Sequence, residues 1–256
     1  MVGINLKGKT ALISGASSGI GAGIARILAC EGVRLSITAR RPDQLLKVAE
    51  EISASASEAP FQVTGDVTKT EDISRILSET TRRLGAIDIL VNCAGGARPV
   101  EPGASDDIWN EAFGLNFTAA RLLTEGVLPA MRAQKWGRII NISGSMEPRT
   151  LNAASAAKAA KAALHLWAKG LSCDVASDGI TINTIPPGRI NSEQILHKLY
   201  PTEELRRDFI NRNIPIGYFG DPEYIGNLVA FLASPLARYI TGAVIPVDGG
   251  MHYFAH

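Results

Sequence analysis

Residues 10–21 read TALISGASSGIG, an apolar run followed by glycines at positions 15, 19 and 21. Behind the glycines, Ile20, Ile24 and Leu28 recur at helical spacing, so the stretch predicts a strand, a tight turn and a helix. Glycine lets a backbone approach a pyrophosphate closely, and a helix N-terminus offers free N–H groups and the positive end of a dipole. We therefore predict a dinucleotide site whose contacts come from Gly15, Ser17, Ser18, Gly19, Ile20 and Gly21.

The alternation that begins here continues to the end of the chain. Apolar runs predict seven strands, at residues 10–14, 34–38, 61–64, 87–91, 138–142, 181–185 and 243–247. Amphipathic stretches predict helices at residues 20–30, 43–53, 71–84, 107–132, 152–177 and 222–233. Because the strands are apolar on both faces, we expect an α/β, doubly wound (Rossmann-like), mostly parallel seven-stranded sheet with helices on both sides. No linker or change of composition divides residues 1–256, which predicts a single domain.

The end of the second predicted strand carries two arginines where a nucleotide ribose would lie. A site for NAD(H) usually has an acidic residue there for the 2′-hydroxyl, whereas an arginine suits the 2′-phosphate of NADP(H). The chain reads Ala39-Arg40-Arg41 at this point and has no acidic residue before Asp43. A guanidinium matches a phosphate well, so we expect NADP(H) rather than NAD(H), bound by Arg40 and Arg41. Two solvated arginines at a strand end are the alternative.

Two segments depart from the alternation. Residues 186–215 follow the sixth predicted strand, with proline at both ends and a predicted helix at 203–212. Ligands of open α/β sheets bind beyond the carboxyl ends of the strands, so we expect a substrate lid at about residues 189–216. Residues 152–163 contain eight alanines. That helix face has little bulk, and a second subunit could approach it closely.

Charge and composition exclude several classes of partner. The 26 Lys and Arg residues nearly balance the 25 Asp and Glu residues, which argues against nucleic acid or an anionic membrane as the main partner. The three cysteines are far apart and predict free thiols in a reducing compartment. No apolar run approaches the roughly 18 residues of a membrane span, and no leader pattern opens the chain, so we expect a cytoplasmic protein. No His, Cys, Asp or Glu cluster has zinc spacing, and we predict no catalytic metal.

With these motifs in view, the chain resembles the short-chain dehydrogenase/reductase family over nearly its whole length. Residues 14–21 are similar to the family's cofactor loop, and residues 240–250 to its C-terminal strand and turn. Asn116 matches a helix asparagine that supports a proton-relay water. The resemblance implies a homotetramer or dimer that acts on a small carbonyl or alcohol. It also implies further cofactor contacts from Asp66, Val67, Asn92, Ala94, Gly95, Pro187, Gly188 and Ile190, and from Lys161 through the nicotinamide ribose.

The resemblance is incomplete at the proton-transfer site. Family members have a serine after the fifth strand, a tyrosine thirteen residues later and a lysine four residues beyond it. Counting from residues 137–142, these positions fall on Gly144, Ala157 and Lys161. The lysine and Asn116 are therefore retained, while the serine and the tyrosine are replaced by residues without a hydroxyl.

Reduction of a carbonyl places a hydride on carbon and a proton on oxygen, and the family tyrosine supplies that proton. Ser143 and Ser145 flank the replaced serine, so a small local shift could bring one hydroxyl into the site. A strand alternates its side chains, which turns Ser143 to the other side and favours Ser145. On the otherwise apolar helix that carries Lys161, packing is the favoured interpretation of His165. We predict catalytic roles for Asn116, Ser145 and Lys161.

Four functions remain open. The first is an active NADP(H)-dependent carbonyl reductase or alcohol dehydrogenase with another proton source, either a flanking serine, a water held by Asn116 and Lys161, or an acidic substrate. The second is a family member that binds the cofactor but performs little redox chemistry. The third is a lyase or isomerase that uses the same pocket. The fourth is a tyrosine-to-alanine variant of an ordinary reductase.

Overall fold

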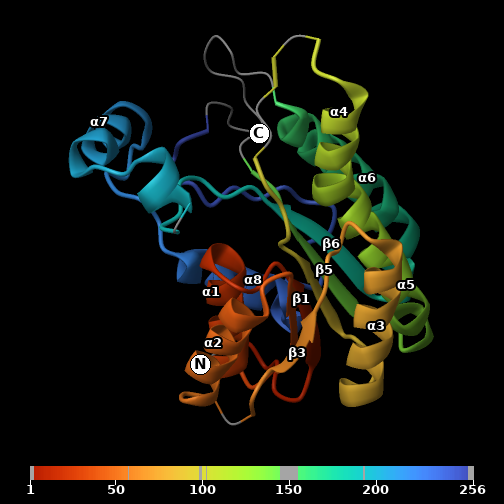
Figure 1. The fold of residues 1–256 in the computed structure, drawn as a ribbon. Helices are drawn as coiled ribbons and strands as arrows, with labels where there is room; N and C mark the ends of the chain where they lie inside the picture. The colour runs from red at the N-terminus through yellow and green to blue at the C-terminus, as the bar shows by residue number, and fades with distance from the viewer. Residues whose placement is uncertain are drawn as a thin grey trace.

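The computed structural model describes residues 3–56, 58–97, 100–101, 103–144, 155–192 and 194–252. Figure 1 shows a central sheet with helices on both of its faces. The strands are β1 (Thr10–Ser14), β2 (Arg34–Ala39), β3 (Phe61–Thr64), β4 (Ile89–Asn92), β5 (Gly137–Ile142) and β6 (Ile180–Ile185). Their ends agree with the first six predicted strands within two residues. The predicted α/β, doubly wound architecture is confirmed.

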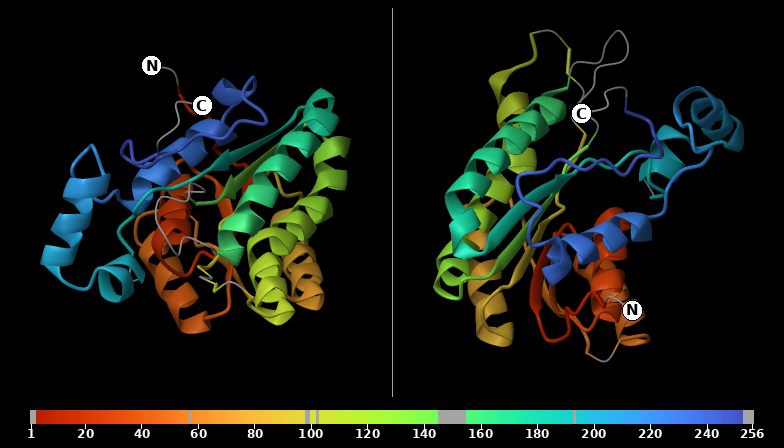
Figure 2. Two further views of the ribbon diagram at one scale, coloured as in Figure 1. Left: turned by 90° about the horizontal axis from the view of Figure 1, so that it is seen from above. Right: turned by 180° about the vertical axis from the view of Figure 1, so that it is seen from behind.

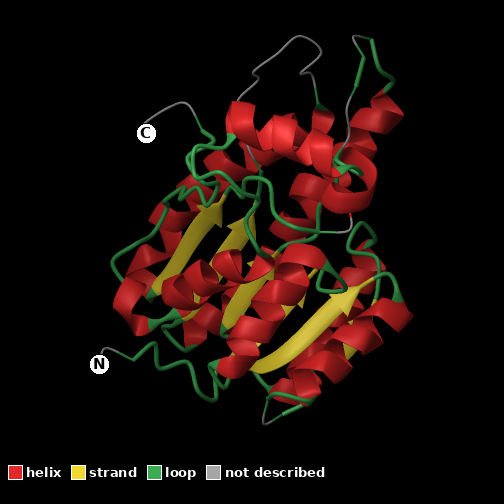
Figure 3. Cartoon of the chain, turned by 90° about the vertical axis from the view of Figure 1, so that its left-hand side faces the viewer, coloured by secondary structure: helices red, strands yellow, loops and turns green. Residues whose placement is uncertain are grey.

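The sheet is parallel, with the strand order β3-β2-β1-β4-β5-β6. Ile13 of β1 is paired with Ile37 of β2 on one side and with Val91 of β4 on the other. The chain order reverses between β1 and β4, which is where open α/β sheets form a crevice for a ligand. Figure 3 shows the arrowheads directed toward one edge of the sheet, and the candidate site lies at that edge.

Helices cover the two faces in two layers, each with its own apolar core. On one face, α1 (Gly19–Cys30), α2 (Pro42–Ser53) and α8 (Pro222–Ala233) share a core that includes Ile13. On the other, α3 (Thr70–Leu84), α5 (Ala119–Ala133) and α6 (Ala156–Val175) share a core that includes Leu12. Neighbouring residues of β1 therefore point to opposite layers, as the period of a strand requires. A 3-10 turn, η4 (Pro235–Ala237), follows α8.

The helix predicted at residues 107–132 consists of three segments, α4 (Asp106–Phe113), the π-helical η1 (Gly114–Thr118) and α5. Asn116 lies in η1, and its side-chain Nδ2 donates to the carbonyl oxygen of Ala112 at 2.9 Å. In a regular α-helix that oxygen accepts from the backbone N–H of Asn116. The side chain therefore competes with the backbone for one acceptor, which favours a wider turn.

The helix predicted at residues 152–177 begins later than expected. Residues 152–154 lie outside the described part of the chain, and Ser155 has extended backbone angles, with φ −157° and ψ 119°. Its Oγ accepts a hydrogen bond from the backbone N–H of Lys158 at 3.4 Å, so Ser155 caps the helix instead of belonging to it. The helix α6 runs from Ala156 to Val175 and continues as a short 3-10 turn, η2 (Ala176–Asp178).

The segment after β6 carries two further helices, η3 (Gln194–Leu199) and α7 (Glu203–Asn213). Figures 1 and 2 show α7 standing apart from the two helical layers. A separate apolar cluster supports it, in which the rings of Tyr200 and Phe209 lie 4.8 Å apart and Phe219 and Met251 are buried. This segment therefore packs on the rest of the fold through a small apolar cluster that is separate from the two main cores.

The prediction of a seventh strand at residues 243–247 was wrong, because the sheet has six strands. The segment still lies parallel to β6, where the N–H of Thr184 donates to the carbonyl of Ala243 at 2.9 Å. Isolated bridges at Thr184 and Pro187 join it to β6 in a single register. In that register residue 186 should donate to the carbonyl of Ile245, but Pro186 has no N–H, although its own carbonyl accepts from the N–H of Val247 at 3.1 Å. The ladder is interrupted there for that reason.

No helix in the described part of the chain is both long enough and apolar enough to cross a membrane. Within the same ranges, no group of three His, Cys, Asp or Glu side chains could hold a metal ion.

Helices α1 and α8 approach each other so closely that one contact requires glycine. A Cβ on Gly23 would lie 2.4 Å from the Cβ of Pro222 and 2.8 Å from its carbonyl carbon. We expect Gly23→Ala to lower the free energy of unfolding by about 1–3 kcal/mol, because an overpacked core must shift. Urea denaturation measures the change. The control is Gly170→Ala in α6, where a Cβ meets nothing within 4 Å. The control should gain about 0.5–1 kcal/mol. Equal losses in both variants would contradict the packing argument.

Candidate active site

A cavity of about 190 Å³ opens at the carboxyl ends of β1, β2, β3 and β4. Most of its lining consists of residues that directly follow a strand: Gly15, Ser17, Ser18, Thr38, Ala39, Arg40, Arg41, Gly65, Asp66, Val67, Cys93, Ala94, Gly95 and Leu115. Nine of these were predicted as cofactor contacts; Thr38, Ala39, Gly65, Cys93 and Leu115 were not. Their place at a strand end or in the π-turn is the only signal that could have identified them.

The turn between β1 and α1 is held open by glycine. Gly15 has φ +70°, and a Cβ on it would lie 2.8 Å from the backbone nitrogen of Ala94. Ser18 precedes the first helical residue, but its side chain does not cap α1, and the first turn of α1 has no acidic residue. The first N–H groups of a helix have no partner within it. The cavity therefore faces a helix N-terminus that the surrounding side chains do not neutralise, which suits a bound phosphate.

A side-chain hydroxyl also joins the ends of β1 and β4 next to this turn. The Oγ of Ser14 accepts from the backbone N–H groups of Cys93, at 3.1 Å, and Ala94, at 3.2 Å. The sequence shows Ser14 only as the first residue of the cofactor-like loop. In the structure its hydroxyl sets the distance between the two segments that border the cavity.

Two arginines that follow β2 also line the cavity. Arg41 Nη2 donates to Ser18 Oγ at 3.3 Å, and Arg40 Nη1 lies 4.0 Å from Asp66 Oδ2. Burial alone would raise the pKa of Asp66, but hydrogen bonds from Thr68 and the charge of Arg40 outweigh it and lower this pKa. The Arg40 side chain remains 69% exposed. Both guanidinium groups are therefore free enough to reach an anion at this rim.

Asn92 does not line the cavity, although it was predicted as a cofactor contact. Its side chain is buried, and its Nδ2 donates to Asn141 Oδ1 at 2.9 Å and to Thr124 Oγ1 at 3.2 Å. These bonds join β4, β5 and α5 below the site. The observed contacts of Asn92 are thus internal to the scaffold.

The segment after β6 reaches the glycine turn, where a Cβ on Gly19 would lie 3.3 Å from the Cβ of Ser192. The N–H of Gly188 donates to the carbonyl of Val247 at 2.9 Å, and a Cβ on Gly188 would lie 2.6 Å from the Cα of Asp248. The Ile190 side chain is buried in the core. Pro187, Gly188 and Ile190 are not among the residues that line the cavity, so their predicted contact with a nicotinamide stays a prediction.

Lys161 and Asn116 meet at Gly95, on the border of the cavity. A Cβ on Gly95 would lie 3.2 Å from Lys161 Nζ and 3.2 Å from Asn116 Oδ1. Lys161 is 8% exposed, and its Nζ donates to the carbonyl of Ile142 at 2.8 Å. Asn116 Oδ1 accepts from the N–H of Gly96 at 3.1 Å. The predicted amine and amide therefore come from two helices to the same point.

Burial determines the protonation states of Lys161 and of the neighbouring Cys93. It lowers the pKa of Lys161 to about 8, although the neighbouring Cys93 opposes the shift. It raises the pKa of the Cys93 thiol to about 12, so the thiol stays protonated at neutral pH. No ion pair joins Lys161 to a carboxylate among the described residues. Lys161 is therefore an ammonium that can release its proton close to neutral pH.

The expected hydroxyl positions are open or filled by methyl groups. A Cβ on Gly144 would meet no atom within 4 Å, and Ala157 lies one turn before Lys161 on α6. Ser145, predicted as catalytic, lies outside the described residues. Ser143 was expected to turn away, but its Oγ lies 2.7 Å from His165 Nε2. The packing interpretation of His165 therefore missed a polar contact one turn beyond Lys161.

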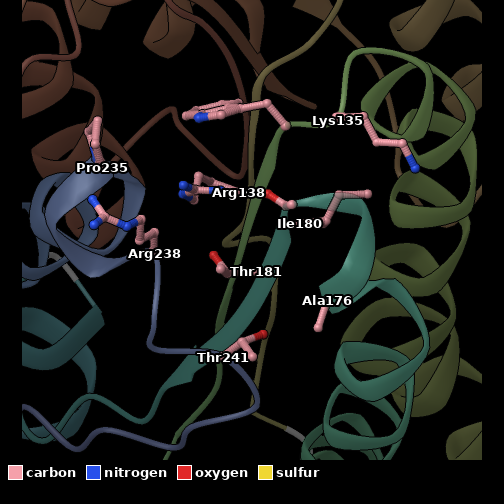
Figure 4. A pocket seen from close by; sticks show the side chains of 10 residues that line it. Lys135, Arg138, Ala176, Ile180, Thr181, Pro235, Arg238 and Thr241 are labelled. Carbon is pink, nitrogen blue, oxygen red and sulfur yellow. Dashed lines mark hydrogen bonds between the residues drawn. The ribbon is translucent and has the colours of Figure 1, made fainter.

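A second, larger cavity of about 420 Å³ lies at the amino ends of β5 and β6 (Figure 4). Arg138 and Thr181 line it at the starts of these strands, and Arg238 faces it from the segment after η4. Arg138 Nη1 donates to the carbonyl of Gly179 at 3.0 Å. This cavity shares no lining residue with the candidate site and is separate from it.

Comparisons with known proteins agree with this geometry. A family described as enoyl-(acyl carrier protein) reductase matches residues 15–252. The chain belongs to the short-chain dehydrogenase/reductase family. Among curated members, the 3-oxoacyl-acyl-carrier-protein reductase FabG of Vibrio harveyi is 37% identical over 251 residues, covering 97% of this chain and 99% of the relative. The corresponding reductase of Aquifex aeolicus is 36% identical, with the same coverage.

Solved structures of family members superpose closely. L-sorbose reductase from Gluconobacter frateurii, complexed with NADPH and L-sorbose, has a TM-score of 0.88 at 30% identity and covers 98% of both chains. A 7α-hydroxysteroid dehydrogenase complexed with NADH and 7-oxo glycochenodeoxycholic acid has a TM-score of 0.90 at 30% identity, covering 97% of this chain and 96% of its own. The family is thus an oxidoreductase family whose members differ in nucleotide and in substrate.

We expect His165 to make the stability of the fold depend on pH. Burial, and then the charge of Lys161, lower the pKa of His165 from 6.5 to about 4. Between these values the unfolded chain binds a proton that the folded chain rejects, so the free energy of unfolding should fall as the pH drops from 6.5 to 4. Urea denaturation at several pH values measures this slope. His165→Gln should flatten it, and an unchanged slope in that variant would assign the effect to other groups.

Proposed function

We propose that this chain is an NADP(H)-dependent oxidoreductase that interconverts a small carbonyl compound and its alcohol. One arrangement carries the proposal: a cavity lies at a helix N-terminus, two arginines line it, and a buried lysine of lowered pKa lies beside its lining residue Gly95. Phosphate groups suit the first two, and proton transfer suits the third. Membership of an oxidoreductase family supports the same reaction class.

The described residues fit a dinucleotide along the crevice. The turn formed by Gly15, Ser17, Ser18, Gly19, Ile20 and Gly21 would hold the pyrophosphate. Asp66 and Val67 would border the adenine, and Ala94 and Gly95 the nucleotide's central part, supported from below by Asn92. Pro187, Gly188 and Ile190 would border the nicotinamide, and Lys161 its ribose.

Arg40 and Arg41 support NADP(H) as the coenzyme. Both line the cavity, with Arg41 bonded to Ser18, and Asp66, the one carboxylate among the described lining residues, receives hydrogen bonds from Thr68 and lies 4.0 Å from Arg40. An acidic partner for an unphosphorylated ribose is therefore replaced by two cations. The L-sorbose reductase complex contains NADPH. The dehydrogenase complex contains NADH, so the choice in this chain depends on its own two arginines.

The nicotinamide would supply or accept the hydride, and the residues of this chain would handle the proton on the substrate oxygen. Gly144 and Ala157 occupy the positions of the family serine and tyrosine and carry no hydroxyl. Lys161 is the buried proton donor that remains. We assign it this role, acting on the substrate through a water that Asn116 helps to orient. The released alcohol carries the proton, and solvent then returns one to Lys161.

Two features outside the crevice complete the proposal. Residues 189–216, which include α7, would form a substrate lid on a single-domain fold. Large apolar side chains on and after α8 are exposed, with Tyr239 100% and Phe231 37% accessible. A second copy of the chain would cover them, which is in keeping with the expected homo-oligomer.

The missing hydroxyls also support a second candidate, a family member that binds NADP(H) but turns over little or no substrate. Loss of a general acid typically costs about 10²–10⁴ in rate. Loss of one oxyanion donor costs about 10²–10³. The two candidates share the cofactor site and differ only in whether Lys161 replaces the tyrosine.

We expect Arg40→Ala to weaken NADPH binding by about 10- to 100-fold and to leave NADH binding almost unchanged. The charge-assisted hydrogen bonds to the 2′-phosphate account for that difference. Fluorescence titration with each reduced nucleotide measures it. Arg121→Ala, on the exposed side of α5, is the control and should bind both nucleotides normally. Equal weakening for both nucleotides would remove Arg40 as the selector.

We expect carbonyl reduction to decline as the pH rises through about 8, because the donor is the protonated form of Lys161 and its pKa is about 8. The reverse oxidation should rise over the same range. Steady-state rates with a panel of carbonyl compounds, followed at pH 6–10, measure both limbs.

Lys161→Met should abolish turnover, and Lys169→Met on the same helix should not. Restoring the hydroxyls with Gly144→Ser and Ala157→Tyr should raise the rate by about 10²-fold or more. Tight NADPH binding without turnover of any compound by the unmodified protein would overturn the reductase proposal in favour of the silent member.

A further inference from the structure

Two side chains of α6 hold consecutive residues at the end of β5. Lys161 Nζ donates to the carbonyl oxygen of Ile142 at 2.8 Å. His165 Nε2 lies 2.7 Å from Ser143 Oγ, within hydrogen-bond distance. Residues four apart lie on the same face of a helix, one turn from each other. The two contacts therefore join α6 to the end of β5 at two adjacent points.

Ser143 is also held from the opposite side. Its backbone N–H donates to the carbonyl of Ile185 in β6 at 2.9 Å. The next residue is Gly144, whose position has space for a Cβ with no atom within 4 Å. In the described range that ends at residue 144, Ser143 is thus the last residue whose side chain makes a hydrogen bond, because the next residue is Gly144.

Electrostatics favour a neutral pair beside a charged lysine. Burial and the Lys161 charge lower the pKa of His165 to about 4, so its imidazole is neutral at neutral pH. The titratable groups that face Lys161 within the described ranges are His165, on its own helix, and Cys93, after β4. Cys93 is a protonated thiol because burial raises its pKa to about 12. The π-turn η1 contributes only Asn116, which does not titrate.

The position of Ile142 decides where the lysine points. A lysine side chain has four rotatable bonds, and the bond to Ile142 is the hydrogen bond that the structure assigns to its ammonium. Without an anchor at Ser143 the end of β5 would be free to shift, and the ammonium would move with it. A misplacement of about 1 Å can cost about 10²-fold in rate.

We propose that Ser143 and His165 are positioning residues for Lys161, which hold the Ile142 carbonyl in place so that the ammonium faces the candidate site. The proposal rests on the proposed function, in which Lys161 is the proton donor. It adds that the hydroxyl of Ser143 and the imidazole of His165 keep Lys161 in position at a site where Gly144 and Ala157 carry no hydroxyl. Neither Ser143 nor His165 needs to touch the substrate.

The first experiment measures the pH profile of carbonyl reduction in Ser143→Ala, His165→Phe and the double variant. Each single variant should reduce kcat by about 10- to 100-fold, with little change in KM for the carbonyl. The double variant should lose no more than the worse single one, because both remove the same bond. The pH at which the rate falls on the alkaline side should move from about 8 toward 10.5. A Lys161 side chain that is no longer held in its buried position becomes hydrated, and its pKa returns toward the ordinary value.

Conservative variants separate positioning from packing. Ser143→Thr retains a hydroxyl and His165→Gln retains a side-chain amide, so each should recover most of the lost rate. Lys169→Gln, two turns beyond Lys161 on α6, is the matched control and should resemble the unmodified protein. Far-ultraviolet circular dichroism and urea denaturation establish that the compared variants are folded.

A second measurement does not need turnover. With lysine labelled at 13Cε, the signal of Lys161 is assigned by its loss in Lys161→Arg, and its chemical shift is titrated from pH 6 to 11. The titration midpoint should rise in Ser143→Ala and His165→Phe and stay at its original value in Lys169→Gln.

The two measurements separate the failure of each proposal. If the unmodified protein shows no turnover but the midpoint rises in both variants, the reductase function fails and the positioning of Lys161 stands. If folded Ser143→Ala and His165→Phe keep both the rate profile and the Lys161 midpoint of the unmodified protein, the pair only packs α6 against β5 and the positioning proposal is overturned.

Discussion

Strand β1 hydrogen-bonds to β2 on one side and to β4 on the other, and α1, which follows β1, lies on the opposite face of the sheet from α5, which follows β4. The chain therefore leaves the carboxyl ends of β1 and β4 in opposite directions and opens a crevice between them. Ser14 and Gly15 allow the two ends to approach, one by accepting two backbone N–H groups and the other by having no Cβ. Every candidate function described above uses this crevice.

The crevice is dominated by groups that favour negative charge. A helix N-terminus, Arg40 and Arg41 surround one part of it, and the buried ammonium of Lys161 borders the other. Asp66 is the one carboxylate in its lining, and it already accepts hydrogen bonds from Thr68. Such a site is complete only with an anionic ligand. Burial lowers the pKa of Lys161 for a related reason, because no carboxylate in the described part of the chain pairs with the buried ammonium.

Polar contacts hold the end of β5 next to Gly144 and Ala157. Gly144 and Ala157 contribute neither hydrogen bonds nor bulk, so the shape of this corner depends on contacts made deeper in the fold. Asn92 joins β4 to β5 through Asn141, and Ser143 joins β5 to α6 through His165. These polar contacts join β4 and α6 to the end of β5, where the carbonyl of Ile142 accepts from Lys161 Nζ.

The sequence by itself determined the strands, most helices, the glycine turn and the arginine rim, because these follow from apolar period and from residues adjacent in the chain. Tertiary structure decided the remainder. Asn92 and Asn141 are 49 residues apart, and Ser143 and His165 are 22 apart. No local pattern could predict that these pairs meet. The π-turn at Asn116 likewise depends on a competing side chain, and the interrupted seventh strand depends on Pro186, which has no N–H for the partner segment. Contacts of this kind are specified only when distant segments pack, since only packing removes the water that would otherwise satisfy each polar group.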